Sequence, residues 1–367
     1  MRIAFFGSSL LSAYWNGAAT YYRGIIRALD ELGYDVTFYE PDAYERQQHR
    51  DIEPPSWARS VVYSTQDKSG VAAALEEASQ ADLLIKASGV GVFDELLDQA
   101  VLDFRRAGAL TAYWDVDAPA TLDAMTADPE KPLCQLVPRY DFIFTYGGGA
   151  PVVSRYKEFG ARECIPIYNA LDPETHHPAS PDHRFAGDVG FLGNRLPDRE
   201  ARVEEFFLRP AAACPEQQFV LGGNGWQDKS LPASVRYVGH VYTADHNAFN
   251  CSTTLVLNIS RASMARYGYS PATRVFEAAG AGACLVTDAW EGIEHFLEPW
   301  SEVIVVHDAE EVAKAVHGVT RSLANDIGIA ARRRVLAEHT YRHRALQFDR
   351  VLNGRDTSVL AYSSTGD

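Results

Sequence analysis

The sequence predicts an α/β protein built from two doubly wound domains, each a parallel sheet with helices on its faces. Short apolar runs alternate with amphipathic stretches along most of the 367 residues, which is the pattern of strands joined by crossover helices. A chain of this length can form two hydrophobic cores. The segment 171–187 contains three prolines and few large apolar residues, so we expect it to link the two halves.

The first half offers six strand candidates with helices between them. The predicted strands span 3–7, 36–40, 83–88, 110–115, 142–146 and 164–169. The predicted helices span 17–32, 70–79, 93–107 and 150–158. We therefore assign residues 1–175 to an N-terminal domain.

The second half repeats this alternation without a repeat in the sequence itself. Its predicted strands span 189–193, 219–222, 235–238, 254–259, 284–287 and 303–306. Its predicted helices span 199–208, 243–250, 271–281, 309–322 and 325–339. We assign residues 188–338 to a C-terminal domain and residues 339–356 to a final helical segment.

The composition is that of an ordinary soluble protein, with 46% apolar and 23% charged residues. The net charge of −15 argues against a general binder of nucleic acid or anionic membranes. The five cysteines are scattered, and no CxxC pair occurs, so we expect reduced thiols. No apolar run approaches the length of a membrane span, and the N-terminus lacks a signal-peptide layout. We therefore expect a cytoplasmic protein.

The segment 273–287, TRVFEAAGAGACLVT, carries the strongest functional signal. Arg274 and Glu277 are three residues apart, so they share one face of a predicted helix. Small residues follow Glu277 and leave room for a ligand. A helix start and an arginine suit a diphosphate, and a glutamate in the same cleft can bind a ribose diol. This arrangement predicts a site for a sugar nucleotide.

Polar residues or glycines follow each predicted strand of the second half. Because the carboxyl ends of parallel strands meet at one edge of a sheet, we expect these residues to surround one ligand. The candidate donor-binding residues, besides Glu277, are Arg195, Arg199, Asn224, Gly225, Trp226, Gly239, His240, Val241, Arg261, Tyr269 and Ser270.

Two glycine-containing turns in the first half are candidates for the acceptor side of the cleft. Gly7, Ser8 and Ser9 follow the first strand, and Gly148 lies in a three-glycine run after the fifth. Each is either a tight structural turn or a place where an acceptor approaches the backbone. Neither GxGxxG nor a P-loop motif is present, so a dehydrogenase and a P-loop NTPase are not expected.

Asp115 and Asp117 lie at the carboxyl end of the fourth predicted strand of the first half, where we expect an aspartate to point into the cleft. Either carboxylate is a candidate general base, a hydrogen-bonding group for a sugar, part of a turn, or a metal ligand. The metal interpretation is the weakest, and we expect no metal and no other cofactor. The pair His176 and His177 is expected to be solvated, and His339 with the following histidines is not expected to bind zinc.

Several segments of the second half resemble the group-1 glycosyltransferase domain of the CgeB-like spore-maturation proteins. They are DVGFLGNR, LGGNGW, YVGHV, HNAFNCS, LNISR, SPATRVFEAAGAG, TDAWEGIE and EHTYRHRA, and RIAFFGSS, YWDVDAP and YNALDP of the first half are similar to the partner domain. The resemblance implies a GT-B fold, in which two Rossmann-like domains face a central cleft. It also implies a nucleotide-sugar donor and no required metal.

The resemblance further assigns roles to residues. It implies that Glu277 binds the donor ribose, that Arg274 neutralises the diphosphate, and that Gly239 and Val241 meet the base. Tyr269 stands where better-known retaining relatives have an acidic residue. It also implies that the segment 340–352 forms a helix that crosses back to the first domain.

We therefore expect a metal-independent glycosyltransferase of hexosyltransferase type (EC 2.4). It would move a sugar from a nucleotide-diphosphate sugar, UDP being the commonest, to a hydroxyl of an unknown glycan, protein or small molecule. Arg274 would stabilise the leaving diphosphate, and Asp115 or Asp117 would act as the base if the reaction inverts. The alternatives are a nucleotide-sugar epimerase of the same architecture and a non-catalytic nucleotide-sugar-binding protein.

Overall fold

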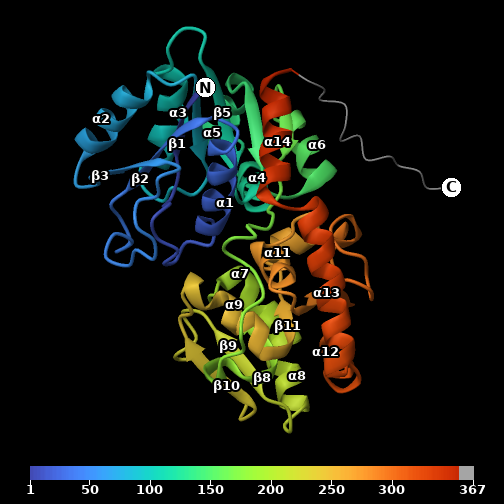
Figure 1. Cartoon of the computed structure of the whole chain (residues 1–367). Helices are drawn as coiled ribbons and strands as arrows, with labels where there is room; N and C mark the ends of the chain where they lie inside the picture. Colours follow the sequence, from blue (N-terminus) through green and yellow to red (C-terminus); the bar gives the residue numbers. More distant parts are fainter. Residues whose placement is uncertain (355–367) are drawn as a thin grey trace, which may run out of the picture.

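The computed structural model describes residues 1–354, which form two α/β domains joined by two chain crossings (Figure 1). Every strand pair in both sheets is parallel, as expected where helices connect successive strands. This confirms the predicted doubly wound class. Residues 355 and 356, the end of the predicted final segment, lie outside the described residues.

The first domain contains a seven-stranded sheet in the order β3-β2-β1-β4-β5-β6-β7. Its strands are β1 (Arg2–Phe6), β2 (Asp35–Pro41), β3 (Arg59–Tyr63), β4 (Leu83–Ala87), β5 (Leu110–Asp115), β6 (Phe142–Thr145) and β7 (Cys164–Pro166). Its helices are α1 (Ala19–Asp30), α2 (Lys68–Ala78), α3 (Asp94–Asp103), α4 (Ala118–Ala127), α5 (Pro132–Leu136) and α6 (Gly149–Glu158), with a 3-10 turn at Val137–Arg139.

Three of these elements, β3, α4 and α5, have no counterpart in the sequence prediction. The sheet has seven strands because β3, which the apolar pattern did not indicate, pairs with β2 at the sheet edge and stays half-exposed. Helix α4 begins directly after Asp117, where Pro119 occupies the first turn. Proline is compatible with that position because the first N–H groups of a helix have no intrahelical partner.

The second domain contains a six-stranded sheet in the order β10-β9-β8-β11-β12-β13. Its strands are β8 (Gly187–Leu192), β9 (Phe219–Gly222), β10 (Val235–Gly239), β11 (Thr253–Asn258), β12 (Cys284–Asp288) and β13 (Ile304–Val306). Its helices are α7 (Pro197–Val203), a π-helical turn Glu204–Leu208, α8 (Arg209–Ala213), α9 (Thr243–Ser252), α10 (Ala262–Tyr267), α11 (Thr273–Gly280), α12 (Ala309–Gly318) and α13 (Arg321–Glu338), with 3-10 turns at His183–Phe185 and Ile293–His295.

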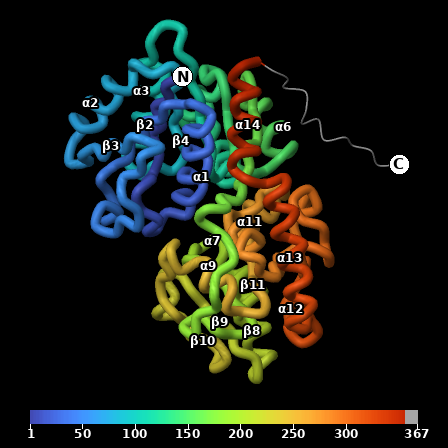
Figure 2. Tube along the Cα trace, in the orientation of Figure 1, coloured from blue at the N-terminus to red at the C-terminus, as the bar shows by residue number. Residues whose placement is uncertain are grey.

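The final helix, α14 (Tyr341–Leu352), leaves the second domain and lies beside α1 of the first, as Figure 2 shows. Its apolar face shares a buried core with α1, in which Phe348 packs against Trp114 of β5. Gly24 of α1 allows this approach, because a Cβ atom there would lie 2.1 Å from the ring of Tyr341. The C-terminal helix therefore fastens the two domains together.

The two crossings lie side by side. The N–H of Leu171 donates to the carbonyl of His339 at 2.8 Å, and the N–H of Tyr341 donates to the carbonyl of Leu171 at 3.0 Å. All five cysteines fall within the described residues, and all are free thiols, as predicted. Within residues 1–354, no helix combines the length and apolarity needed to cross a membrane.

Candidate functional site

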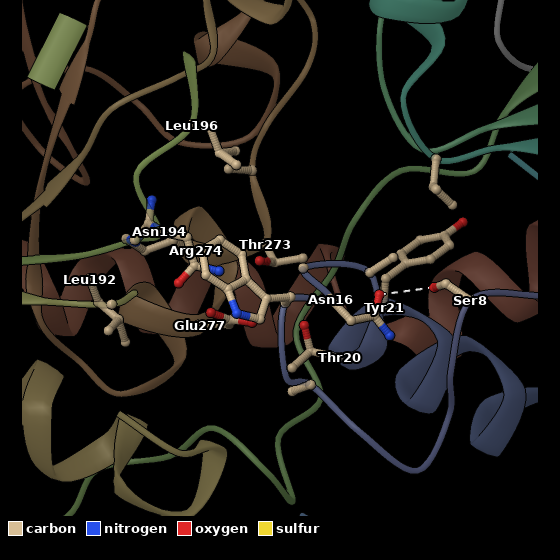
Figure 3. Close-up of a pocket in the computed structure, with 18 of the residues that line it drawn as sticks. Ser8, Asn16, Thr20, Tyr21, Leu192, Asn194, Leu196, Thr273, Arg274 and Glu277 are labelled. Carbon is tan, nitrogen blue, oxygen red and sulfur yellow. Dashed lines mark hydrogen bonds between the residues drawn. The ribbon is translucent and has the colours of Figure 1, made fainter. Parts of the chain in front are cut away.

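A cavity of about 620 Å³ lies between the domains, where the carboxyl ends of both sheets face each other. Figure 3 shows its two walls, with Arg274 and Glu277 on one side and Ser8 and Asn16 on the other. The lining includes five of the predicted donor residues, namely Arg199, His240, Val241, Arg261 and Glu277. It also includes Arg274, predicted to stabilise the leaving diphosphate, and Ser8 and Asp117 of the first domain.

Arg199 and Arg274 place two positive charges at one point of the second-domain wall. A Cβ atom on Gly193, which follows β8, would lie 3.1 Å from Nη2 of Arg199 and 3.2 Å from Nη2 of Arg274. Both guanidinium groups also lie over the ring of Phe191, at 5.8 and 5.2 Å from its centroid. Glycine at position 193 therefore leaves both arginines open to a ligand.

Neither arginine forms an ion pair with a carboxylate in residues 1–354; Arg274 instead donates to Oδ1 of Asn258 at 3.0 Å. Burial lowers the pKa of Arg199 to about 9, with repulsion from Arg274 adding to the effect. Burial likewise lowers the pKa of Arg274 to about 10. Two partly buried guanidinium groups that form no ion pair make a site that an anion such as a diphosphate would stabilise.

Glu277 lies one helical turn after Arg274 on α11 and is 9% exposed. Burial alone would raise its pKa, but His176, His246 and Arg274 outweigh it, and the pKa is lowered. The side chain is therefore a carboxylate at neutral pH, and it can accept hydrogen bonds from a pair of hydroxyl groups.

The expectation that His176 is solvated is wrong, because it is only 3% exposed. Its ring lies 5.9 Å from that of His246 in α9, and its Nε2 atom is 4.0 Å from a carboxylate oxygen of Glu277. One potential ligand atom from each of the three residues lies within 4.8 Å of the others. The sequence missed this cluster because the linker holds His176 against the second domain rather than in solvent. His177, its neighbour, is exposed as predicted.

The structure separates the two candidate bases. Asp115 is fully buried and does not line the cavity; it accepts hydrogen bonds from Ser88, Thr121 and Tyr156. These contacts correct the expectation that it points into the cleft. Asp117, two residues later, lines the cavity and forms an ion pair with Arg261 of the second domain. Burial raises the pKa of Asp117, and Arg261 opposes the rise.

Several predicted donor residues pack against the second-domain wall of the cavity without lining the cavity. Arg195 is engaged by Glu200 and Asp228 and does not line the cavity. Trp226 is 1% exposed and donates from its indole nitrogen to the carbonyl of Gly193 at 2.8 Å. Three other predicted residues hold the loops after β9 and β10 without lining the cavity, namely Asn224, Gly225 and Gly239.

Tyr269, Ser270 and Gly148 belong to a contact between the domains rather than to the cavity lining. The N–H of Gly148 donates to the carbonyl of Tyr269 at 2.7 Å. A Cβ atom on Gly147 would lie 3.1 Å from Ser270. The glycine run after β6 thus allows the second domain to approach closely.

Gly7 and Ser9 also have structural contacts. A Cβ atom on Gly7 would lie 2.3 Å from the ring of Phe38, and the hydroxyl of Ser9 donates to Glu40 at 3.0 Å. Ser8, between them, lines the cavity and donates to Asn16 at 2.9 Å.

Other lining residues are not among the predicted site residues, for example Asn16, Thr20, Arg46, Asp51, Asn194 and Thr243. Asn16 and Thr20 precede and begin α1, so a search of the whole loop after β1 would have found them. Asp51 and Thr243 meet across the cleft, where Thr243 donates to Oδ2 of Asp51 at 2.9 Å. Only the folded arrangement brings these two segments together.

Comparison with known proteins agrees with this arrangement. Residues 199–350 match the sequence family described as glycosyl transferase-like. A search of curated proteins finds no match.

Solved glycosyltransferase structures resemble the whole chain. Sucrose-phosphate synthase from Thermosynechococcus elongatus superposes with a TM-score of 0.69 at 13% identity, over 96% of this chain and 98% of that one. HepE of Anabaena, in complex with UDP and glucose, gives a TM-score of 0.68 at 15% identity, over 96% and 100%. The E. coli trehalose-6-phosphate synthase, bound with UDP-2-fluoro glucose, gives a TM-score of 0.65 at 9% identity, over 96% and 99%. The chain therefore has the GT-B fold.

Proposed function

We propose that the protein is a glycosyltransferase that moves a sugar from a nucleotide-diphosphate sugar to an acceptor hydroxyl, without a required metal. The observation that carries this proposal is the convergence of Arg199, Arg274 and Glu277 on one cavity of a GT-B fold. The similarity to the CgeB-like proteins and the hexosyltransferase class are part of the same proposal.

In the proposed donor complex, Glu277 accepts hydrogen bonds from the ribose hydroxyls, and the two arginines hold the diphosphate. As the bond to the sugar breaks, negative charge grows on the diphosphate, and preorganised guanidinium groups stabilise it. Two arginines supply here the charge that a cation supplies in other transferases. We propose UDP as the nucleotide because the HepE structure contains UDP with glucose.

On the acceptor side, Asp117 is the group we propose as general base for an inverting reaction. It lies at the carboxyl end of β5, lines the cavity, and has one buried carboxylate oxygen, Oδ1, without a hydrogen-bond partner in the described chain. Because burial raises its pKa, its affinity for a proton is greater than that of a solvated aspartate.

A thermal-shift panel with UDP, GDP, dTDP, ADP and CMP tests the donor assignment. A nucleoside diphosphate at 100 times its Kd raises the unfolding free energy by about 2.7 kcal/mol. We expect UDP to raise the melting temperature most. Incubation with UDP-glucose alone separates the epimerase alternative, because a transferase leaves the free donor sugar unisomerised. If no nucleotide shifts the melting temperature, the proposal is wrong.

A further inference from the structure

Arg46 also lines the cavity; it is buried, and it comes from the first domain. It is 7% exposed, its Nη1 atom donates to the carbonyl of Ser8 at 3.1 Å, and its guanidinium lies 5.0 Å from the ring centroid of Tyr44. Its Nε atom is buried without a hydrogen-bond partner, and no carboxylate within residues 1–354 forms an ion pair with it. Such a charge is costly to bury alone.

The acidic groups near Arg46 are already engaged. Glu40, whose charge acts on Arg46, accepts hydrogen bonds from the N–H of Leu10 at 2.5 Å and from Gln47 at 2.7 Å. Asp51 forms an ion pair with Arg23 at 2.7 Å. Neither carboxylate forms an ion pair with Arg46, and burial lowers the pKa of Arg46 although Glu40 opposes the effect.

The backbone before Arg46 is held in an unfavourable conformation. Tyr44 and Glu45 both have φ values of +56°, a region that residues with a Cβ atom rarely adopt. The hydroxyl of Tyr44 donates to the carbonyl of Gly91 at 2.7 Å and fixes this turn to the loop after β4. Backbone strain of this kind concentrates at functional sites, where it holds a side chain in a particular orientation.

Arg46 also lies at the topological switch point of the first sheet. From β1 the chain builds outward through β2 and β3, and from β4 it builds outward through β5, β6 and β7. Ligands of doubly wound sheets bind in the crevice where the order reverses. Ser8 follows β1, Ser88 and Gly89 follow β4, and all three line the cavity with Arg46. A Cβ atom on Gly89 would meet no atom within 4 Å, so the crevice is open there.

We propose that Arg46 belongs to an acceptor subsite and that the acceptor carries an anionic group, a phosphate or a carboxylate, on a sugar. The assignment of this site to the acceptor rests on the proposed function. The anion site itself rests only on Arg46 and the residues around it. A planar guanidinium in the cavity lining suits either group, because both accept paired hydrogen bonds.

Calorimetric titration tests this with glucose 6-phosphate, glucuronate and glucose at constant ionic strength. Saturating UDP is present to occupy the arginines of the second domain. We expect at least one of the two anionic sugars to bind the wild type tenfold or more tightly than glucose. Arg46→Met should lose that preference, and Arg46→Lys should keep part of it. Arg50→Met is the matched control, since Arg50 is exposed in the same segment and donates hydrogen bonds to Gln47.

Three outcomes would overturn the proposal: equal binding of all three sugars, unchanged binding by Arg46→Met, or a loss of UDP affinity in Arg46→Met, which would move this residue to the donor site. If UDP does not bind the wild type, the proposed donor function fails separately. The same titrations are then made in an Arg274→Met background without UDP, and they still decide whether Arg46 binds the anion.

Discussion

Arg261 of the second domain forms an ion pair with Asp117 of the first, and this contact spans the cavity. Arg261 also contacts Asp198 at 2.6 Å within its own domain. One guanidinium thus joins the candidate base to the wall that bears the proposed donor site. In this arrangement the position of Asp117 depends on closure of the two domains.

The first prediction concerns Asp117 as general base. Asp117→Asn should lower kcat by at least 100-fold, because proton transfer by a positioned side chain contributes 10²–10⁴-fold. The Kd for UDP should change less than about threefold by the same reasoning, since the residue lies on the acceptor side. Asp198→Asn removes the other partner of Arg261 and should affect kcat much less. Equal losses in both variants would show that only the ion-pair network matters.

The second prediction concerns the ribose. Glu277→Gln should weaken UDP binding by about 10-fold to 100-fold, because hydrogen bonds to a charged group contribute about 1.5–3 kcal/mol. Calorimetry with 2′-deoxy-UDP provides the check. The wild type should bind the deoxy analogue more weakly than UDP, and this preference should be smaller in the variant, because a neutral amide oxygen is a weaker acceptor than a carboxylate. A variant with an undiminished preference for UDP would place the ribose elsewhere.

The third prediction separates arginines that line the cavity from one that does not. Arg199→Met and Arg274→Met should each weaken UDP at least about tenfold, as expected when a charge-assisted contact is lost, and leave uridine affinity nearly unchanged. Arg195→Met is the control, because Glu200 and Asp228 already engage Arg195. Loss of uridine affinity in the first two variants would indicate a collapsed pocket instead.

The fourth prediction concerns the contact between α1 and α14. Gly24→Ala should destabilise the protein by about 1–3 kcal/mol, because the added methyl group overlaps the buried ring of Tyr341. Gly318→Ala, at the end of α12, meets no atom within 4 Å and should be neutral or slightly stabilising. Chemical denaturation of both variants measures the difference. Equal stabilities would mean that α14 shifts without cost.

The fifth prediction concerns acid stability. Burial lowers the pKa of His339 to about 3, whereas an unfolded histidine titrates near 6.5. Between these values the unfolded chain binds a proton that the folded protein does not, so the unfolding free energy falls as the pH drops below about 6.5. The slope from this residue reaches at most about 1.4 kcal/mol per pH unit.

His339→Gln should therefore reduce the fall in unfolding free energy between about pH 6.5 and pH 5. Urea denaturation at each pH measures this free energy. Burial also lowers the pKa of His246, to about 4, so part of the dependence should remain. His183→Gln is the control, since its side chain is 97% exposed. A wild-type stability that does not change over this range would contradict the prediction.

The sequence could predict those elements whose apolar face is buried. It missed β3 because an edge strand is half-exposed and lacks a strong apolar run. It also could not distinguish Asp115 from Asp117, because a strand end gives both residues the same local context. Their difference comes from Ser88, Thr121 and Tyr156, which lie far apart in the chain and enclose only Asp115.

The sequence also could not distinguish charged side chains that face the cavity from those that do not. Arg195 and Arg199 both follow β8, but carboxylates at positions 200 and 228 engage Arg195 and leave Arg199 for the cavity. His176 had no local signal at all, because its burial depends on α9 and α11. Local pattern therefore located the wall of the site, and tertiary pairing decided which side chains face the ligand.

A crystal structure of the protein soaked with UDP tests the central claim most directly. The account predicts the ribose hydroxyls within hydrogen-bond distance of the Glu277 carboxylate, and the diphosphate against the guanidinium groups of Arg199 and Arg274. A nucleotide bound away from these three side chains, or a cavity that stays empty at saturating UDP, would contradict it.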